Sequence, residues 1–430
     1  MRLDILYEHA GEAMFLFEHR QRALASLVLD GDFLRDLDER LLAHLDGLAV
    51  AGDAGWEVAA ALAGADEPSG LFVTTAVALI AGAPRALEAL DGLLLAAEWP
   101  AFAAMSWALR LWPHPVASAS DRARGWLDRP EARLRAASIT ALTAAGGPPG
   151  GPALARALAD PGADPALLQA ALAGVGQTRD RQHLAAVLRW AAHPEVGADL
   201  RATALQTALL LDRREACDLA RKCLGNESDR AGAARVLGIA GEASDARALA
   251  GVLAGAAPDA ERAILLALGN LGWAEGVDAL LDVARGDRVG ARVAGFALGR
   301  ILGASADWRP RAPAPSAGAA TGDGDEDNGE PWTPDQELPL WQIDPVATAW
   351  QAVRARLGAG QRLRGGGALV VGAPAARSPL GMRADEEWER ALVTPDAAPP
   401  DVAALCVPQP FSWRAPATGS APATARARRA

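Results

Sequence analysis

An Ala-Leu pair, once replaced by Val-Leu, recurs eight times in an apolar helical pattern, and no other feature constrains the fold of this chain as strongly. Successive leucines of the pair are 30, 33, 30, 37, 28, 31 and 30 residues apart. In most units a turn residue such as Gly146 or Gly241 follows, and then a second amphipathic segment. Each unit therefore predicts helix, turn, helix, and such units bury their faces by stacking into a solenoid. The pairs are Ala78-Leu79, Ala108-Leu109, Ala141-Leu142, Ala171-Leu172, Ala208-Leu209, Val236-Leu237, Ala267-Leu268 and Ala297-Leu298.

Composition agrees with closely packed helices. Hydrophobic residues make up 50% of the 430 residues but aromatic residues only 5%, so the apolar content is mainly small or straight-chain helix formers. We therefore predict an all-α fold, with a solenoid of about eight helical pairs over residues 63–303.

Different regions flank this array. Residues 1–62 predict an N-terminal helical cap, in which Phe15 and Phe17 belong to the first apolar pattern. Residues 304–338 are a Pro/Gly/acid-rich linker, and residues 339–364 predict a short helical segment. Residues 365–430 have low complexity and predict a disordered tail, which we expect to be dispensable for binding. A leucine stripe in the cap consists of Leu34, Leu37, Leu41, Leu45 and Leu48.

Acidic and arginine residues recur near the start of the first helix of a unit. A spacing near 30 with an Ala-Leu core and such charges resembles the short HEAT-like repeat of phycobilin lyases. The resemblance implies a ladder of charges between successive turns, and the alternative is that acids simply favour helix N-termini. The residues concerned are Glu131 with Arg135, Asp199 with Arg201, Asp229 with Arg230, Asp259 with Glu261 and Arg262, and Asp287 with Arg292.

The opening residues carry a closer resemblance. They include Tyr7-Glu8-His9-Ala10, the run from Leu37 to Leu48, and Gly55-Trp56-Glu57. These stretches resemble an uncharacterised proteobacterial HEAT-repeat family whose members are often encoded near type VI secretion genes. The match covers residues 1–303 and returns weakly from Trp341 to Gly365. The resemblance implies no particular activity, because none is established for the members of this family.

The sequence excludes several kinds of chemistry. Lys222 is the single lysine, and no Gly-Lys-Ser/Thr phosphate loop, nucleophile elbow or dinucleotide fingerprint is present. Asp323, Asp325 and Asp327 begin like a calcium loop, but its sixth and twelfth positions are not the required Gly and Glu. Cys217 and Cys223 lack metal-ligand spacing, so we interpret them as small buried helix residues. With Cys406, they are too few for a disulfide framework.

Histidine and glutamate residues lie near the N-terminus, and these are the residue types that hold the di-iron centre of HEAT-repeat hydroxylases. The His-Glu order is reversed in Glu8-His9 and Glu18-His19, and no later histidine is followed by Glu. We therefore favour capping and surface polarity over a metal site for these residues and for Glu12.

Charge and hydropathy indicate the kind of partner. The net charge is −11, and residues 1–62 hold 12 acidic against 5 basic residues, so we expect no nucleic acid but a basic protein at that end. Neither a signal peptide nor a membrane span is predicted, which favours the cytoplasm. Six late tryptophans either anchor a partner or dock onto the chain's own array; they are Trp308, Trp332, Trp341, Trp350, Trp388 and Trp413.

These observations favour a non-catalytic interaction scaffold or adaptor without cofactor or metal. Its protein partner is not identified by the sequence, and the family resemblance implies an accessory of type VI secretion. The alternative is a HEAT-repeat enzyme of the bilin-lyase or di-iron hydroxylase type, which only the repeat type supports.

Overall fold

In the part of the chain that the structure describes, helices and their connecting loops account for all residues except one short hairpin and one isolated bridge. The computed structural model describes residues 2–64, 67–111, 117–145, 151–160, 162–286, 288–305, 307–311, 333–357, 361–368 and 378–394. Over these residues the exceptions to helix and loop are the antiparallel strands β1 (Leu363–Arg364) and β2 (Gly367–Ala368) and a bridge between Pro310 and Trp341. The prediction of an all-α protein is confirmed.

Three helices form the N-terminal region. They are α1 (Leu3–Leu24), α2 (Gly31–Val50) and α3 (Asp53–Leu62). They pack on one another and on α4. The predicted leucine stripe is buried on α2, as its spacing of three and four residues requires. Between α1 and α2, Arg20 Nε lies 2.7 Å from Asp38 Oδ1, and neither side chain is exposed. This buried ion pair holds the two longest helices in one register.

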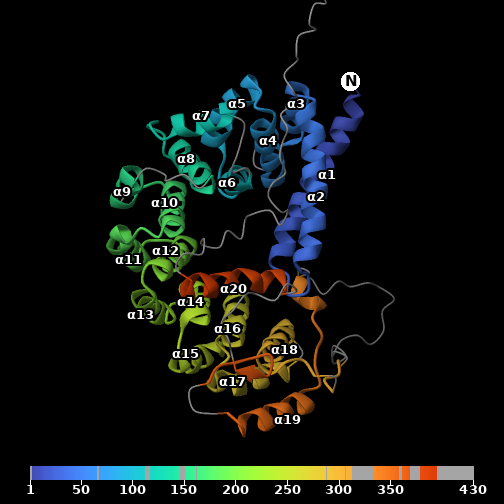
Figure 1. The fold of residues 1–430 in the computed structure, drawn as a ribbon, viewed down its shortest axis with the longest axis vertical. Coiled ribbons are helices and arrows are strands. Elements are labelled where there is room, and N and C mark those ends of the chain that lie inside the picture. Colours follow the sequence, from blue (N-terminus) through green and yellow to red (C-terminus); the bar gives the residue numbers. More distant parts are fainter. Residues whose placement is uncertain are drawn as a thin grey trace, which may run out of the picture.

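Eight helices follow one another along the inside of a curve, and we call them the inner row (Figure 1). Each packs directly on the next, from α4 through α18. The inner row consists of α4 (Pro68–Ala81), α6 (Ala101–Leu111), α8 (Ala132–Ala144), α10 (Pro165–Thr178), α12 (Ala198–Leu211), α14 (Arg230–Ala240), α16 (Pro258–Leu271) and α18 (Val289–Leu302).

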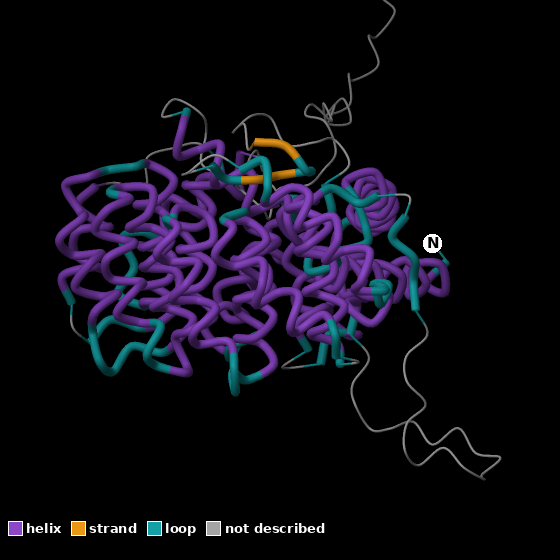
Figure 2. Tube along the Cα trace, turned by 90° about the horizontal axis from the view of Figure 1, so that it is seen from below, coloured by secondary structure: helices purple, strands orange, loops and turns teal. Residues whose placement is uncertain are grey.

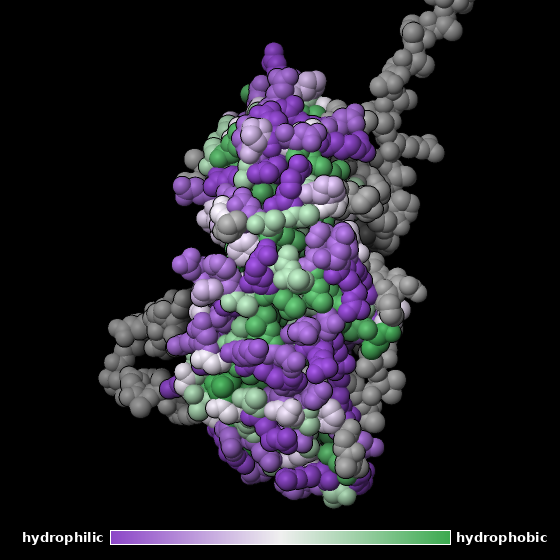
Figure 3. All heavy atoms as spheres, turned by 90° about the vertical axis from the view of Figure 1, so that its left-hand side faces the viewer, coloured by the Kyte–Doolittle hydropathy of each residue, from purple (hydrophilic) through white to green (hydrophobic). Residues whose placement is uncertain are grey.

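Seven further helices alternate with these in sequence and lie on the outside of the curve as the outer row (Figure 1). Polar and charged side chains lie between apolar ones on the side seen in Figure 3. The outer row consists of α5 (Pro84–Ala96), α7 (Ala117–Trp126), α9 (Gly151–Ala159), α11 (Leu184–Ala192), α13 (Arg213–Cys223), α15 (Ala243–Leu253) and α17 (Ala274–Ala284). Single 3-10 turns, η1 (Arg181–His183) and η2 (Glu227–Asp229), precede α11 and α14.

Small residues set the spacing of the inner row. A Cβ at Gly238 of α14 would lie 2.7 Å from Cα and Cβ of Ala267 on α16. A Cβ at Gly269 of α16 would likewise lie 2.9 Å from Cβ of Ala297 on α18. In the outer row, by contrast, a long side chain joins neighbouring helices, with Arg221 Nε on α13 2.7 Å from Asp245 on α15. Close contact inside and long side chains outside bend the two rows into an arc.

The C-terminal residues return to the array. The elements are η3 (Pro334–Glu337), α19 (Ile343–Arg354), the β1–β2 hairpin and α20 (Leu380–Val393). Helix α19 packs on α17 and α18, and the fully buried Trp350 donates its indole N–H to Asp278 at 3.0 Å. The hairpin lies along one edge of the array (Figure 2). We expected disorder over residues 365–430, but residues 380–393 form the ordered helix α20. This helix is ordered because its amphipathic face packs on residues that lie far away in the sequence.

Helix α20 spans the inside of the curve, from α14 to α1 (Figure 1). At its start, the N–H of Leu380 donates to Leu29 O and that of Gly381 to Ser26 O, both at 2.8 Å. The arc itself also returns to its beginning, since Arg262 Nη2 on α16 donates to the Ala25 carbonyl at 2.8 Å. The N-terminal region and the later repeats are therefore in direct contact.

We expect Ala267→Phe to destabilise the fold by about 1 to 3 kcal/mol, because the ring would enter the contact between α14 and α16. The free energy of unfolding from urea titration measures the effect. Ala248→Phe, on the exposed side of α15, is the matched control and should change stability by less than about 0.5 kcal/mol. Equal stability of the two variants would contradict the close approach of the inner helices.

Candidate interaction surfaces

Exposed apolar side chains gather in the N-terminal region. Of the ten large hydrophobic residues described as exposed, seven lie between residues 3 and 50. We call the exposed side of α1, together with the start of α2, the N-terminal face. Single exposed apolar residues are ordinary, but several in one region indicate a contact surface. The seven are Leu3, Ile5, Tyr7, Phe15, Val28, Phe33 and Val50.

Three rings form a surface cluster on this face. The His19 ring lies 5.9 Å from Phe15 and 5.7 Å from Phe33 between ring centroids, and Phe15 remains 53% exposed. Exposed acids stand one helical turn away, Glu12 from Phe15 and Asp36 from Phe33. The arrangement is an apolar aromatic centre flanked by exposed acids, and the exposed Arg22 and Arg35 beside it are paired with Glu18 and Asp32.

Among the cavities along the inner row, two lie between successive inner helices from α6 to α16. The larger, of about 630 Å³, is the central cavity, bounded by α1, α6, α12, α14, α16 and α20. The second, of about 440 Å³, lies along α6, α8 and α10, and Trp107 lines both. Its walls are mostly apolar, and its polar groups include Arg110, Gln169 and Gln177. The polar groups of the central cavity include Gln21, Gln206 and Asp259.

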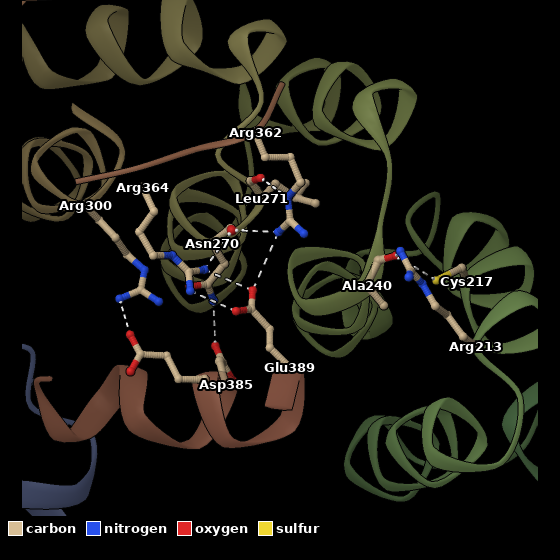
Figure 4. A network of polar contacts seen from close by, with 11 residues as sticks. Arg213, Cys217, Ala240, Asn270, Leu271, Arg300, Arg362, Arg364, Asp385 and Glu389 are labelled. Atoms are coloured by element: carbon tan, nitrogen blue, oxygen red, sulfur yellow. Dashed lines mark hydrogen bonds and ion pairs between the residues drawn. The ribbon is translucent and has the colours of Figure 1, made fainter. Parts of the chain in front are cut away.

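Helix α20 is held by its acidic side chains. Asp385 Oδ1 lies 2.8 Å from Arg235 Nε of α14, while its other oxygen accepts from Asn270 Nδ2 of α16 at 2.9 Å. The next residue along α20 is Glu386, whose Oε1 lies 2.7 Å from Arg300 Nη1 of α18. Successive inner helices thus each contribute one partner to α20, and Figure 4 shows those of α16 and α18, Asn270 and Arg300.

The hairpin adds two more arginines. Glu389 accepts from both terminal nitrogens of Arg364, at 2.9 and 3.0 Å, and lies 3.6 Å from Arg362 Nη2 (Figure 4). Burial lowers the pKa of Arg362, and the nearby Glu389 carboxylate offsets this effect only in part. We call the surface formed by these partners of α20 the arginine groove; it consists of Arg235, Asn270, Arg300, Arg362 and Arg364.

Helix C-termini hold these arginines in place. Arg362 Nε donates to Leu271 O at 2.7 Å, and Arg364 Nη2 donates to Asn270 O at 3.2 Å. Arg213 does the same for the end of α14, with Nε 2.9 Å from Ala240 O (Figure 4). Terminal carbonyls lack helical partners and carry partial negative charge, so guanidinium groups both satisfy and stabilise them.

The histidines and glutamates considered for metal binding do not converge. His9 Nδ1 lies 3.0 Å from Nδ1 of His44, a contact between α1 and α2. His19 instead joins the aromatic cluster, and Glu18 pairs with Arg22 at 3.2 Å. Among the residues that the structure describes, no group of three or more His, Cys, Asp or Glu side chains is placed to hold a metal ion.

The cysteines lie where we expected. Cys217 and Cys223 are both buried in α13, so their interpretation as small buried helix residues is confirmed. Burial raises the pKa of Cys217 to about 11 and also raises that of Cys223. A thiol of this kind is a poor nucleophile at neutral pH. Cys406 lies outside the described residues.

One rung of the expected charge ladder is present. Arg201 Nε on α12 lies 3.1 Å from Asp229 Oδ1 before α14, which links successive repeats. Glu131 pairs instead with exposed Arg129 at 3.0 Å, as a solvated helix start would. Arg262 is bound to Asp335, whose Oδ1 lies 3.0 Å from Nη2, and so connects α16 to η3. The ladder between repeats and the solvated helix start therefore each apply at some positions. Asp287 lies outside the described residues, as does the acidic run from Asp323 to Asp327.

The late tryptophans within the described residues dock onto the chain itself. Trp308 and Trp350 are buried, and Trp341 and Trp388 pack against the same core. Their positions favour the docking interpretation over a partner anchor. Trp332 and Trp413 lie outside the described residues.

Comparison with known protein families and with curated proteins gives no match. Within the part of the chain that the structure describes, no helix combines the length and apolarity needed to cross a bilayer. Geometry and charge are therefore the properties that indicate what each candidate surface can bind.

The arginine groove escaped sequence reasoning. A local signal existed, since Asp385, Glu386 and Glu389 recur at helical spacing beside Met382 and Trp388. Its partners are spread over α14, α16, α18 and the hairpin, and no spacing rule connects them.

His44 should make stability depend on pH. Burial and the neighbouring His9 lower the pKa of His44 below its ordinary value, so the unfolded chain binds the proton more readily. The free energy of unfolding should therefore fall as the pH drops from about 7.5 to about 5. His44→Asn should reduce this fall, and His193→Asn serves as the control for histidine loss. An identical pH profile for wild type and His44→Asn would contradict the prediction.

Cys217 and Cys223 should resist alkylation in the folded protein. With a pKa of about 11, Cys217 is a thiolate in only about one molecule in a thousand at pH 8, and burial blocks access as well. Iodoacetamide labelling followed by peptide mass spectrometry should modify both residues after denaturation but neither before. Rapid labelling of native Cys217 would show that α13 is not packed as described.

Proposed function

We propose that the chain is a non-catalytic scaffold, a HEAT-like α-solenoid that binds a basic protein partner through its N-terminal face. The observation that carries the proposal is the surface cluster of Phe15, His19 and Phe33 amid acidic side chains. Aromatic side chains supply apolar area, and the acids select a basic partner and speed its approach.

The packing of consecutive helices supports the interpretation of this fold as a solenoid. Consecutive inner helices pack on one another, and an outer helix follows each of α4 to α16. Helix α19 packs on α18 and α17 and so stands as the outer partner of an eighth pair. A solenoid of this kind presents surface already ordered before binding, which lowers the entropic cost of association.

The charge of the chain and its family resemblance also indicate the kind of partner and the place where the protein works. The acidic excess of residues 1–62 disfavours nucleic acid as a partner. We place the protein in the cytoplasm and, from the family resemblance, among the accessory proteins of type VI secretion. No described observation favours the enzyme alternative.

Phe15→Ser together with Phe33→Ser should remove partner binding while preserving the fold. The test is affinity capture from the native host, with wild type and variant compared and the retained proteins identified by mass spectrometry. Leu95→Ser, at an exposed leucine of α5, is the matched control and should capture as wild type does. The captured protein should be basic and should be released at about 0.5 M salt, because exposed charges are then screened.

Two results would contradict this function. One is capture that the Phe15→Ser, Phe33→Ser variant retains in full. The other is stoichiometric iron or a chromophore in the purified protein, which would favour the enzyme alternative.

A further inference from the structure

Helix α20 buries charges in a way that an ordinary packing helix does not. Asp385, Glu386 and Glu389 have side chains only 10%, 8% and 6% exposed, and each is paired. Its apolar contacts come from the buried Leu380, Met382 and Ala391 and from Trp388 and Leu392, which pack partly buried against the core. The attachment of α20 therefore combines apolar packing with matched buried charges, and the charges set which helix fits.

The hairpin side of the arginine groove is held in place without α20. Arg362 and Arg364 are anchored on the terminal carbonyls of α16, and the N–H groups of Gly365 and Gly366 bind the carbonyls of Arg300 and Ile301 on α18 at 2.8 and 3.0 Å. These contacts lie within the array and hairpin. Arg362 and Arg364 are thus preorganised for whichever helix occupies the groove.

The same charges determine which helices fit. Burying a guanidinium group without a partner costs several kcal/mol, whereas a matched pair roughly balances its desolvation. An apolar helix would leave Arg300, Arg362 and Arg364 without a carboxylate partner, and a basic helix would repel them. A helix with acids at the positions of Asp385, Glu386 and Glu389 meets every requirement.

We propose that the arginine groove is a recognition site for an acidic amphipathic helix of a partner protein, and that α20 is its internal occupant. A partner helix with the same pattern of acids competes with α20 for the groove. This site is separate from the N-terminal face and calls for a partner of opposite charge, so it goes beyond the function proposed above.

The test uses the full chain with α20 weakened and the groove intact. The variant carries Asp385→Asn, Glu386→Gln and Glu389→Gln, and the probe is a fluorescent peptide with the wild-type sequence of residues 378–394. Fluorescence anisotropy should show binding at least about tenfold tighter to the variant than to wild type, whose tethered helix competes at high effective concentration. A peptide carrying Glu386→Lys and Glu389→Lys should not bind.

A charge exchange tests the groove itself. Adding Arg300→Glu to the variant should abolish binding of the wild-type peptide, and the peptide with Glu386→Arg should restore it. Binding that ignores Arg300→Glu, or no binding to a variant whose circular dichroism is native, would overturn the proposal. Variants of the N-terminal face should leave these results unchanged, so the two proposals fail independently.

Hydrogen exchange on the wild-type chain covers the case in which the variant does not fold. Recognition in trans requires α20 to detach while the array stays folded, so amides of residues 380–393 should exchange faster than those of α14, α16 and α18. Equal exchange rates in α20 and these helices would show that α20 is a fixed part of the fold and would overturn the proposal.

Discussion

The close approach of helix backbones along the inner row is the constraint on which the rest of the structure depends. Gly238 against Ala267 and Gly269 against Ala297 leave no room for a larger side chain. Outer helices are kept apart by arginine and carboxylate side chains, as at Arg221 and Asp245. The difference in spacing produces curvature, and curvature brings α16 back to the end of α1.

Curvature also creates the surfaces that distinguish this protein from a plain stack of helices. Because the arc closes on itself, the inner row encloses the central cavity and offers α20 a path from α14 to α1. The C-terminal ends of α16 and α18 then meet the hairpin, which supplies arginines to the carbonyls of α16 and backbone N–H groups to those of α18. Those arginines in turn require acidic partners, since buried positive charge is not stable alone.

Two opposite charge environments result. The N-terminal face is acidic with exposed aromatic rings, and the arginine groove is basic and already filled by α20. Partners of opposite charge therefore suit the two sites, which is the property expected of an adaptor that joins two proteins.

The sequence by itself determined what is local. Helix positions, the buried leucines of α2 and the burial of Cys217 follow from spacings of three and four residues, which place side chains on one helix face. It did not separate Phe17, stacked on Phe72 at 3.8 Å between ring centroids, from the exposed Phe15 two positions earlier. Which side of α1 is covered depends on α2 and α4, not on α1.

Only the tertiary structure decided the closure of the arc, the order in α20 and the pairing of its acids. Arg235 and Asp385 are 150 residues apart, and no periodicity links them. Curvature accumulates from a small rotation at each repeat, set by contacts between helices that are distant in sequence. The local pattern therefore specified the repeating unit, and the packing of many units decided where the chain meets itself.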